Sequence, residues 1–213
     1  MTTYAYNAMS TLETLKVILS ISEEDTSYDK FLVLLINYAS SWIESMTGRR
    51  FALSPYTQAL AGSGQQELVL RQYPIREVAS ITDIENRVTV PPPSYSFREE
   101  GDIGVIYRDE GWPARAFPTG LVPDFIQTRR YLEVKYTAGY VLPKDFAEDT
   151  PEDWKLPASL QGIVSQIAAQ ELALNGNGAD GLSAFSIADV SWTFDKAPRE
   201  SWTTILNTFM RVV

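Results

Sequence analysis

Pairs of adjacent carboxylates are the residues in this sequence whose type and spacing come nearest to catalytic chemistry. There are three of them, Glu99-Glu100, Asp109-Glu110 and Glu148-Asp149. A glycosidase needs two carboxyl groups that face each other across a cleft, and neighbouring loop residues do not meet that geometry. Turn residues flank each pair, so we interpret all three as solvated loops. A hydrolase that uses carboxylates alone stays a third hypothesis.

The sequence contains no histidine and no cysteine. The usual general base, the usual zinc ligand and any triad built on histidine are therefore excluded. Thiolate metal sites and disulfides are excluded as well. We expect a protein that is not an enzyme, with no catalytic residue, no metal site and no cofactor.

One glycine pattern, Gly176-x-Gly178-x-x-Gly181, has the letters of a dinucleotide fingerprint. That fingerprint requires a strand before it and a helix after it. Here a predicted helix precedes the glycines and a predicted strand follows them. We interpret the stretch as a flexible link.

Charge and hydropathy limit the classes of partner. The chain has 213 residues, 45% of them hydrophobic, and a net charge of -9. This acidity argues against a protein that grips nucleic-acid phosphates, because such proteins need a basic face. No apolar run reaches the length of a membrane span, and we expect no contact with a membrane.

The longest predicted element is a helix from Thr26 to Gly48. Thr26 and Asp29 have capping-box spacing, and Gly48 suits the left-handed end of a helix. Its apolar positions have helical spacing: Phe31, Leu35, Tyr38, Trp42 and Met46. Because residues 31–36 are all apolar, we expect this part to be buried on every side, with Trp42 in the core.

Shorter helices are predicted near both ends of the chain. One follows a capping box formed by Ser10 and Glu13, and another begins near Pro157 and ends at Asn175-Gly176. A last helix opens at Pro198, after a short strand in which Val190, Trp192 and Phe194 alternate with polar residues. In between, turn signals separate six candidate strands: Gln66–Leu70, Arg76–Ile84, Val88–Val90, Ser94–Phe97, Ile103–Tyr107 and Tyr131–Tyr136.

This order of elements predicts an α+β fold. A small helical bundle would be built from the two ends of the chain, with an antiparallel β module inserted between them. The expected boundaries are 1–50 and 142–213 for the bundle and 51–141 for the insertion. Neither terminal part has a sufficient core alone, so the two should meet in space.

Aromatic and aliphatic residues at two places are the candidate partner-binding residues. The last helix carries an apolar stripe of Trp202, Ile205, Leu206 and Phe209. The stripe either packs on its own bundle or docks on a neighbouring protein. Trp112 lies in the loop GWPARAFP, and its turn-rich surroundings make it the best exposed candidate.

Three stretches together resemble the head-tail connector (adaptor) family of tailed bacteriophages, in its longer form. The first is the short helix, the link SEEDTSYD and FLVLLINYASSWIESMTGRRF, between Leu15 and Phe51. The second is LRQYPIREVASI with EVKYTAGY, at 70–81 and 133–140. The third is PASLQGIVSQIAAQEL, then SIADVSWTF, then a helix closing in Phe-Met-Arg.

The resemblance implies a structural virion protein. Members of that family form a ring, commonly of twelve copies, beneath the portal protein. The ring extends the DNA channel and seats the tail or a stopper protein. The expected place is therefore the neck of the virion, after assembly in the host cytoplasm, and DNA would pass through without specific binding.

Two further hypotheses come from the residues. A binding module, in which the β insertion recognises a sugar or a host surface, is the alternative to the connector. If the chain forms a ring, its negative charge would repeat around the channel and keep DNA from adhering.

Overall fold

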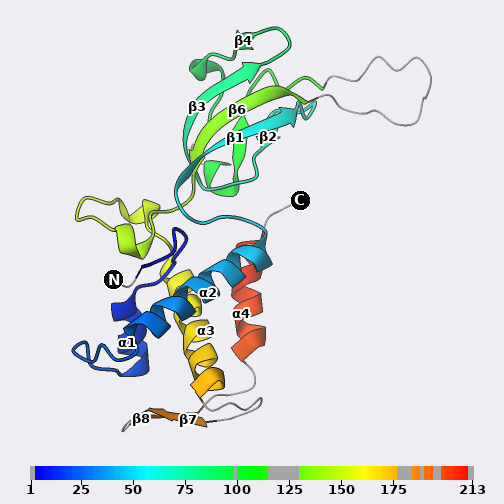
Figure 1. Ribbon diagram of the computed structural model, residues 1–213. Helices are drawn as coiled ribbons and strands as arrows, with labels where there is room; N and C mark the ends of the chain where they lie inside the picture. The colour runs from blue at the N-terminus through cyan, green and yellow to red at the C-terminus, as the bar shows by residue number, and fades with distance from the viewer. Residues whose placement is uncertain are drawn as a thin grey trace. The chain divides into compact units, whose positions relative to one another are not determined.

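The computed structural model describes residues 3–97, 100–114, 130–176, 184–187, 190–193 and 198–210. The chain forms two compact units (Figure 1). One, here called the helical unit, combines Met1–Ala52 with Tyr140–Val213, and the other, the β unit, is Leu53–Gly139. Helices in the first unit and antiparallel strands in the second confirm the predicted α+β class.

Four α-helices build the helical unit: α1 (Leu12–Leu19), α2 (Asp29–Thr47), α3 (Ala158–Gly176) and α4 (Pro198–Asn207). The central pair is α2 and α3, with α1 on one side and α4 on the other (Figure 1). A two-stranded hairpin, β7 (Ala184–Ile187) with β8 (Val190–Thr193), separates α3 from α4 in sequence. None of the helices in the described ranges is long and apolar enough to cross a membrane.

The core of the helical unit joins the two ends of the chain. From the N-terminal part it takes Met9, Leu15, Leu32, Ile36, Ile43 and Phe51, and from the C-terminal part Leu160, Val164, Ala168, Leu172, Trp202 and Leu206. The predicted meeting of the terminal helices is therefore confirmed. Each part alone would leave an apolar face in water.

Both predicted capping boxes are wrong. The N-cap of α1 is Thr11, whose Oγ1 accepts a hydrogen bond from the backbone N of Thr14 at 3.2 Å. Ser10 is buried instead, with its Oγ 2.8 Å from that of Ser165. The N-cap of α2 is Tyr28, which makes no side-chain cap. At the other end of α2 the prediction is confirmed, since Gly48 has φ 67.

Burial along α2 also differs from the prediction. Leu32, Leu35 and Ile36 face the core, but Phe31 is 36% exposed and Leu34 is 60% exposed. The run 31–36 is therefore not buried on every side, because α1, α3 and α4 cover only part of the helix. Trp42, predicted in the core, is half-buried and packs against its edge.

A buried lysine on α1 holds the loop between α1 and α2 and the start of α2 in place. Lys16 lies on α1, and its Nζ is 2.7 Å from Oδ1 of Asp29, the first residue of α2. The same ammonium donates to the backbone oxygens of Glu23 at 3.1 Å and Asp25 at 2.7 Å. Three acceptors compensate for the loss of water around a charge that is almost fully buried.

The β unit is built on a four-stranded antiparallel sheet in the order β1-β6-β3-β4. Its strands are β1 (Ser54–Ala61), β3 (Ile75–Asp83), β4 (Val88–Thr89) and β6 (Arg130–Ala138). A separate ladder pairs β2 (Glu67–Val69) with β5 (Val105–Tyr107). The sequence did not predict β1, whereas the other five strands overlap predicted segments, with β3 and β6 extending beyond them.

The segment Ser94–Phe97 is not a strand. Pro92–Ser94 form a 3₁₀ turn, and Ser96 makes a single bridge with Tyr107. Three consecutive prolines remove the backbone donors that a strand would need before this point.

Candidate functional site

The apolar stripe predicted on the last helix packs on its own bundle. Trp202 is 5% exposed and Leu206 is buried, both in the core of the helical unit. Phe209 packs edge to face on Phe51, with ring centroids 6.3 Å apart. Of the four predicted residues, Ile205 alone is exposed. Most of the stripe therefore faces the bundle: Leu206 is enclosed, Phe209 is partly buried, and Trp202 reaches the surface at its edge alone.

Polar contacts hold the same segment in place. The Nε1 of Trp202 donates to Oε1 of Gln166 on α3 at 2.7 Å. Nη1 of the buried Arg49, just after α2, donates to the backbone oxygen of Phe209 at 3.3 Å. Trp202 thus joins α4 to α3, and Arg49 joins the turn after α4 to the segment after α2.

Trp112 is not the exposed residue that the loop composition predicted. It is 1% exposed and lies in the core of the β unit. Its backbone N donates to the oxygen of Gln65 at 2.8 Å, and its Nε1 donates to the oxygen of Ile106 at 3.3 Å. The turn-rich segment folds inward because its backbone pairs with a second segment distant in sequence. The prediction of an exposed Trp112 is therefore wrong.

A groove of about 250 Å³ opens on the helical unit beside α4. Its walls come from three helices: Tyr38, Trp42 and Met46 on α2, Ile167, Gln170 and Glu171 on α3, and Trp202 and Thr203 on α4. The α2 wall is uncharged and largely aromatic. Such a surface suits apolar contact with a partner better than it suits proton transfer.

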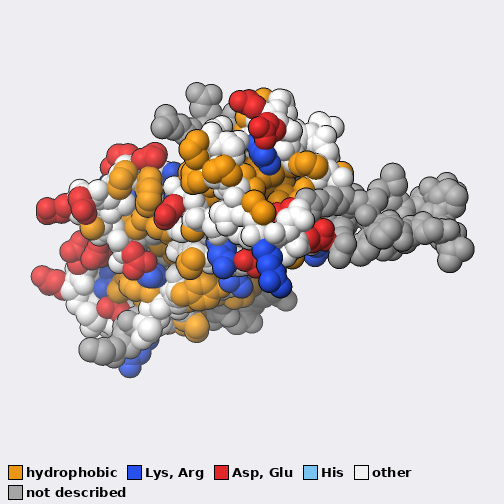
Figure 2. All heavy atoms as spheres, turned by 90° about the horizontal axis from the view of Figure 1, so that it is seen from above, with side chains coloured by type: hydrophobic (Ala, Val, Ile, Leu, Met, Phe, Trp, Pro, Cys, Tyr) orange, Lys and Arg blue, Asp and Glu red, His pale blue; other side chains and the backbone are white. Residues whose placement is uncertain are grey.

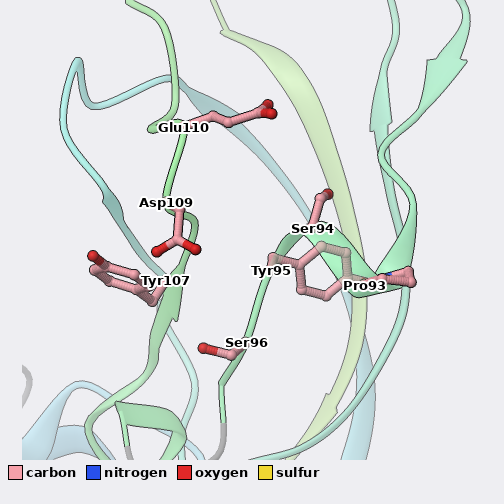
Figure 3. Close-up of a pocket in the computed structure, with 7 residues that line it drawn as sticks. All are labelled: Pro93, Ser94, Tyr95, Ser96, Tyr107, Asp109 and Glu110. Atoms are coloured by element: carbon pink, nitrogen blue, oxygen red, sulfur yellow. The ribbon is translucent and has the colours of Figure 1, made fainter.

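A second hollow, of about 310 Å³, lies in the β unit. Its lining residues are Pro93, Ser94, Tyr95, Ser96, Tyr107, Asp109 and Glu110. In Figure 3, Tyr107 and Asp109 stand on one side of the hollow, and Pro93, Ser94 and Tyr95 stand on the other. Partial burial raises the pKa of Tyr95 above its ordinary value of 10.0.

The candidate carboxylate pairs do not form a catalytic site. Asp109-Glu110 and Glu148-Asp149 are exposed and belong to different units. Figure 2 shows red carboxylates gathered along the left side of the view, open to solvent. Glu99 lies outside the described residues. Among the residues that are described, no three acidic side chains are grouped so as to hold a metal ion.

The glycine pattern begins at the last residue of α3, Gly176, and the other two glycines lie outside the described residues. A helix therefore precedes it, as predicted, and the strand that a dinucleotide site requires before its glycines is missing at this position.

Comparison with known proteins finds similarity only at the level of structure. No family model matches the chain, and no curated protein matches its sequence. A chain in the neck of an empty gene transfer agent particle, computed with C6 symmetry, is similar with a TM-score of 0.54 and 15% identity. The match covers 100% of this chain and 95% of that one. A chain in the virion of a native gene transfer agent particle gives a TM-score of 0.50 and 17% identity, over 100% of this chain and 94% of that one. At such identities the likeness shows the fold, and it shows that fold over the whole length of both units.

Proposed function

We propose that this chain is a structural protein of the neck of a tailed, phage-like particle. The observation that carries the proposal is the full-length likeness to a chain in the neck of a gene transfer agent particle, which covers both units. The resemblance of three sequence stretches to the connector family supports the same role independently.

In its finer form, the proposal assigns the chain to a connector ring of twelve copies between portal and tail. Copies in a ring meet head to tail, so each must present two different surfaces. The ring would dock beneath the portal protein, extend the DNA channel and seat the tail or a stopper protein. No catalytic step is assigned to the chain, in keeping with the exposed positions of Asp109-Glu110 and Glu148-Asp149 in different units.

Deletion of the gene in a particle-producing host tests the proposal. We expect filled heads and separate tails by electron microscopy, with joined particles restored by the wild-type gene. Imaging of purified wild-type particles should place the chain at the junction of head and tail. Normal joined particles without the protein, or its absence from purified particles, would contradict the proposal.

A second candidate function has one observation in its favour, the tyrosine-lined hollow of the β unit. Aromatic rings beside carboxylates and hydroxyls form surfaces that can hold a sugar or a polar peptide. Screening of the purified protein and of Tyr107→Ala against an array of glycans tests it. Binding that the variant loses would support recognition of a sugar, and no binding to any glycan would leave the connector as the proposal.

A further inference from the structure

The groove beside α4 combines aromatic rings with one carboxylate. Tyr38 and Trp42 line it from α2, Trp202 lines it from α4, and Glu171 lines it from α3. Of the eight described residues that line the groove, Glu171 alone is charged. Aromatic rings attract a cation through their negative faces, and a carboxylate attracts it through its charge. The lining therefore favours a positively charged group.

The residues that would contact this group are accessible on the folded helical unit. Tyr38 is 51% exposed and Met46 is 46% exposed, while Trp42 and Glu171 are half-buried. Because partial burial lowers the effective dielectric around the carboxylate of Glu171, an ion pair formed there is stronger than one on an open surface. A side chain that enters the groove thus reaches both the rings and the carboxylate.

The volume of the groove limits what it can hold. At about 250 Å³ it is smaller than the pockets of roughly 300–1,000 Å³ that bind drug-sized ligands, so it suits a single long side chain. Arginine fits the lining better than lysine does. Its planar guanidinium stacks on aromatic rings and makes two parallel hydrogen bonds to a carboxylate, whereas the ammonium of lysine is a more strongly hydrated point charge.

The surface of α2 next to the groove indicates what surrounds this arginine. Leu34 lies one turn before Tyr38 and is 60% exposed, so it offers an apolar contact to a neighbouring residue of the partner. Lys30 lies one further turn away and is exposed, and it would repel a second basic residue at that position. The surface therefore favours a segment with one arginine beside apolar residues over a run of basic residues.

The charge of the helical unit favours the same partner. Its sequence ranges hold 16 acidic and 9 basic residues, against 11 acidic and 9 basic residues in the β unit. The resulting negative potential attracts a positively charged segment to the helical unit and opposes the approach of another copy of this acidic chain.

We infer that the groove beside α4 binds an arginine side chain from a segment of another protein, whose apolar residues contact Leu34. In the bound state the guanidinium lies against Tyr38 and Trp42 and pairs with the carboxylate of Glu171. The inference goes beyond the proposed function, because it assigns a binding site to the helical unit whether or not the chain forms part of a neck.

Titration of the purified full chain with short capped peptides tests the inference. One peptide contains one leucine and one arginine among alanines, and two others carry citrulline or norleucine in place of the arginine. Citrulline keeps the shape of arginine without its charge, and norleucine keeps only an apolar chain. Nuclear magnetic resonance follows binding through the indole N–H signals of Trp42 and Trp202, at low and at high salt.

We expect the arginine peptide to shift both indole signals, and the citrulline and norleucine peptides to bind at least tenfold more weakly. High salt should weaken binding of the arginine peptide. Glu171→Gln should reduce the affinity for this peptide at least fivefold, and Tyr38→Ser at least threefold. Glu148→Gln is the matched control, since it removes an exposed carboxylate of the same unit, and it should bind the peptide like the wild type.

Circular dichroism establishes that each variant is folded, and Tyr38→Ser keeps the test decisive if Glu171→Gln does not fold. Equal binding of the arginine and norleucine peptides would overturn the inference, because the groove would then hold a purely apolar segment. No shift with any peptide, or equal losses for Glu171→Gln and Glu148→Gln, would overturn it as well. So would association of the chain with itself that Tyr38→Ser abolishes, because the groove would then hold a second copy.

The two proposals fail separately. Peptide binding is measured on the purified chain, so its absence overturns the inference and leaves the place of the protein in the particle to imaging. Normal joined particles without the protein overturn the proposed function alone.

Discussion

Replacement of Trp202 by alanine is the sharpest test of how α4 is held. The side chain is 5% exposed, packs in the core of the helical unit and donates a hydrogen bond to Gln166. Removal of a buried tryptophan costs about 3–5 kcal/mol of unfolding free energy. Trp202 borders the groove, so water can enter the space left behind, and we expect a loss near the lower end, about 3 kcal/mol.

Two further variants separate the contributions. Trp202→Phe keeps most of the ring packing and loses the indole donor, so it should cost about 1 kcal/mol. Asn207→Ala changes an exposed residue of the same helix and should stay within about 0.5 kcal/mol of the wild type.

Urea unfolding followed by far-ultraviolet circular dichroism measures these differences. The four α-helices of the described residues belong to the helical unit, so the helical signal reports that unit. Truncation after Ala197 should lower the unfolding free energy of the helical unit by more than Trp202→Ala does. If Trp202→Ala unfolds at the same urea concentration as Asn207→Ala, then α4 is not packed in solution. That result would support the alternative in which the apolar stripe of α4 docks on a neighbouring protein.

Three other substitutions and one pH dependence are predicted. Lys16→Met should destabilise the helical unit by about 2–3 kcal/mol in urea unfolding, because it leaves Asp29 and two backbone oxygens without their ammonium; an unchanged midpoint would show that water replaces the charge. Gly62→Ala should cost about 2–3 kcal/mol, since its Cβ would lie 2.0 Å from the backbone oxygen of Pro113. Gly48→Ala should cost only about 1 kcal/mol, because its φ of +67 is unfavourable for alanine but nothing lies within 4 Å of the new atom; equal losses for the two glycines in thermal melts would contradict this reasoning. Burial raises the pKa of Tyr136 above its ordinary value of 10.0, so the unfolded chain releases the phenolic proton first and the β unit should lose stability as pH rises above 10.0. Tyr136→Phe should show a smaller alkaline loss in melts over this pH range, and an identical loss would assign the effect to another group.

The sequence predicted the helices and their meeting because helical periodicity is a local pattern. Gly48 and Pro198 lie at helix ends as their backbone preferences require. The strands β2, β3 and β6 were predicted for the same reason, since turn residues bound them. β1 was missed because its inward residues, Tyr56, Gln58 and Leu60, are only half-buried and one of them is polar.

Whether a given apolar residue is buried depends on contacts between segments that are distant in the sequence, and a local sequence pattern does not reveal these contacts. Leu32 and Leu34 are equally apolar, yet only the first faces the neighbouring helices. Trp112 has the surroundings of an exposed loop residue and is buried by pairing with Gln65. Lys16 gives no sign in the sequence that its ammonium is enclosed. The interaction surface was therefore predicted on α4, where Ile205 is exposed, whereas α2 exposes four large apolar residues: Phe31, Leu34, Tyr38 and Met46.

The place where the chain leaves and re-enters the helical unit has a thermodynamic consequence. Ala52 bridges Tyr140, and the backbone N of Tyr140 donates to the oxygen of Phe51 at 2.7 Å. The β unit begins and ends one step further on, where Ser54 of β1 pairs with Ala138 of β6.

If the insertion were unfolded, bringing Ala52 and Tyr140 together would cost about 4 kcal/mol of chain entropy. Once β1 and β6 have paired, the two ends of the β unit are already adjacent. The N- and C-terminal helices can then meet as easily as helices joined by a short connection. Folding of the β unit therefore lowers the entropic cost of bringing the N- and C-terminal helices together. A short turn in its place should serve equally well, whereas mutations that unfold it should weaken the helical bundle.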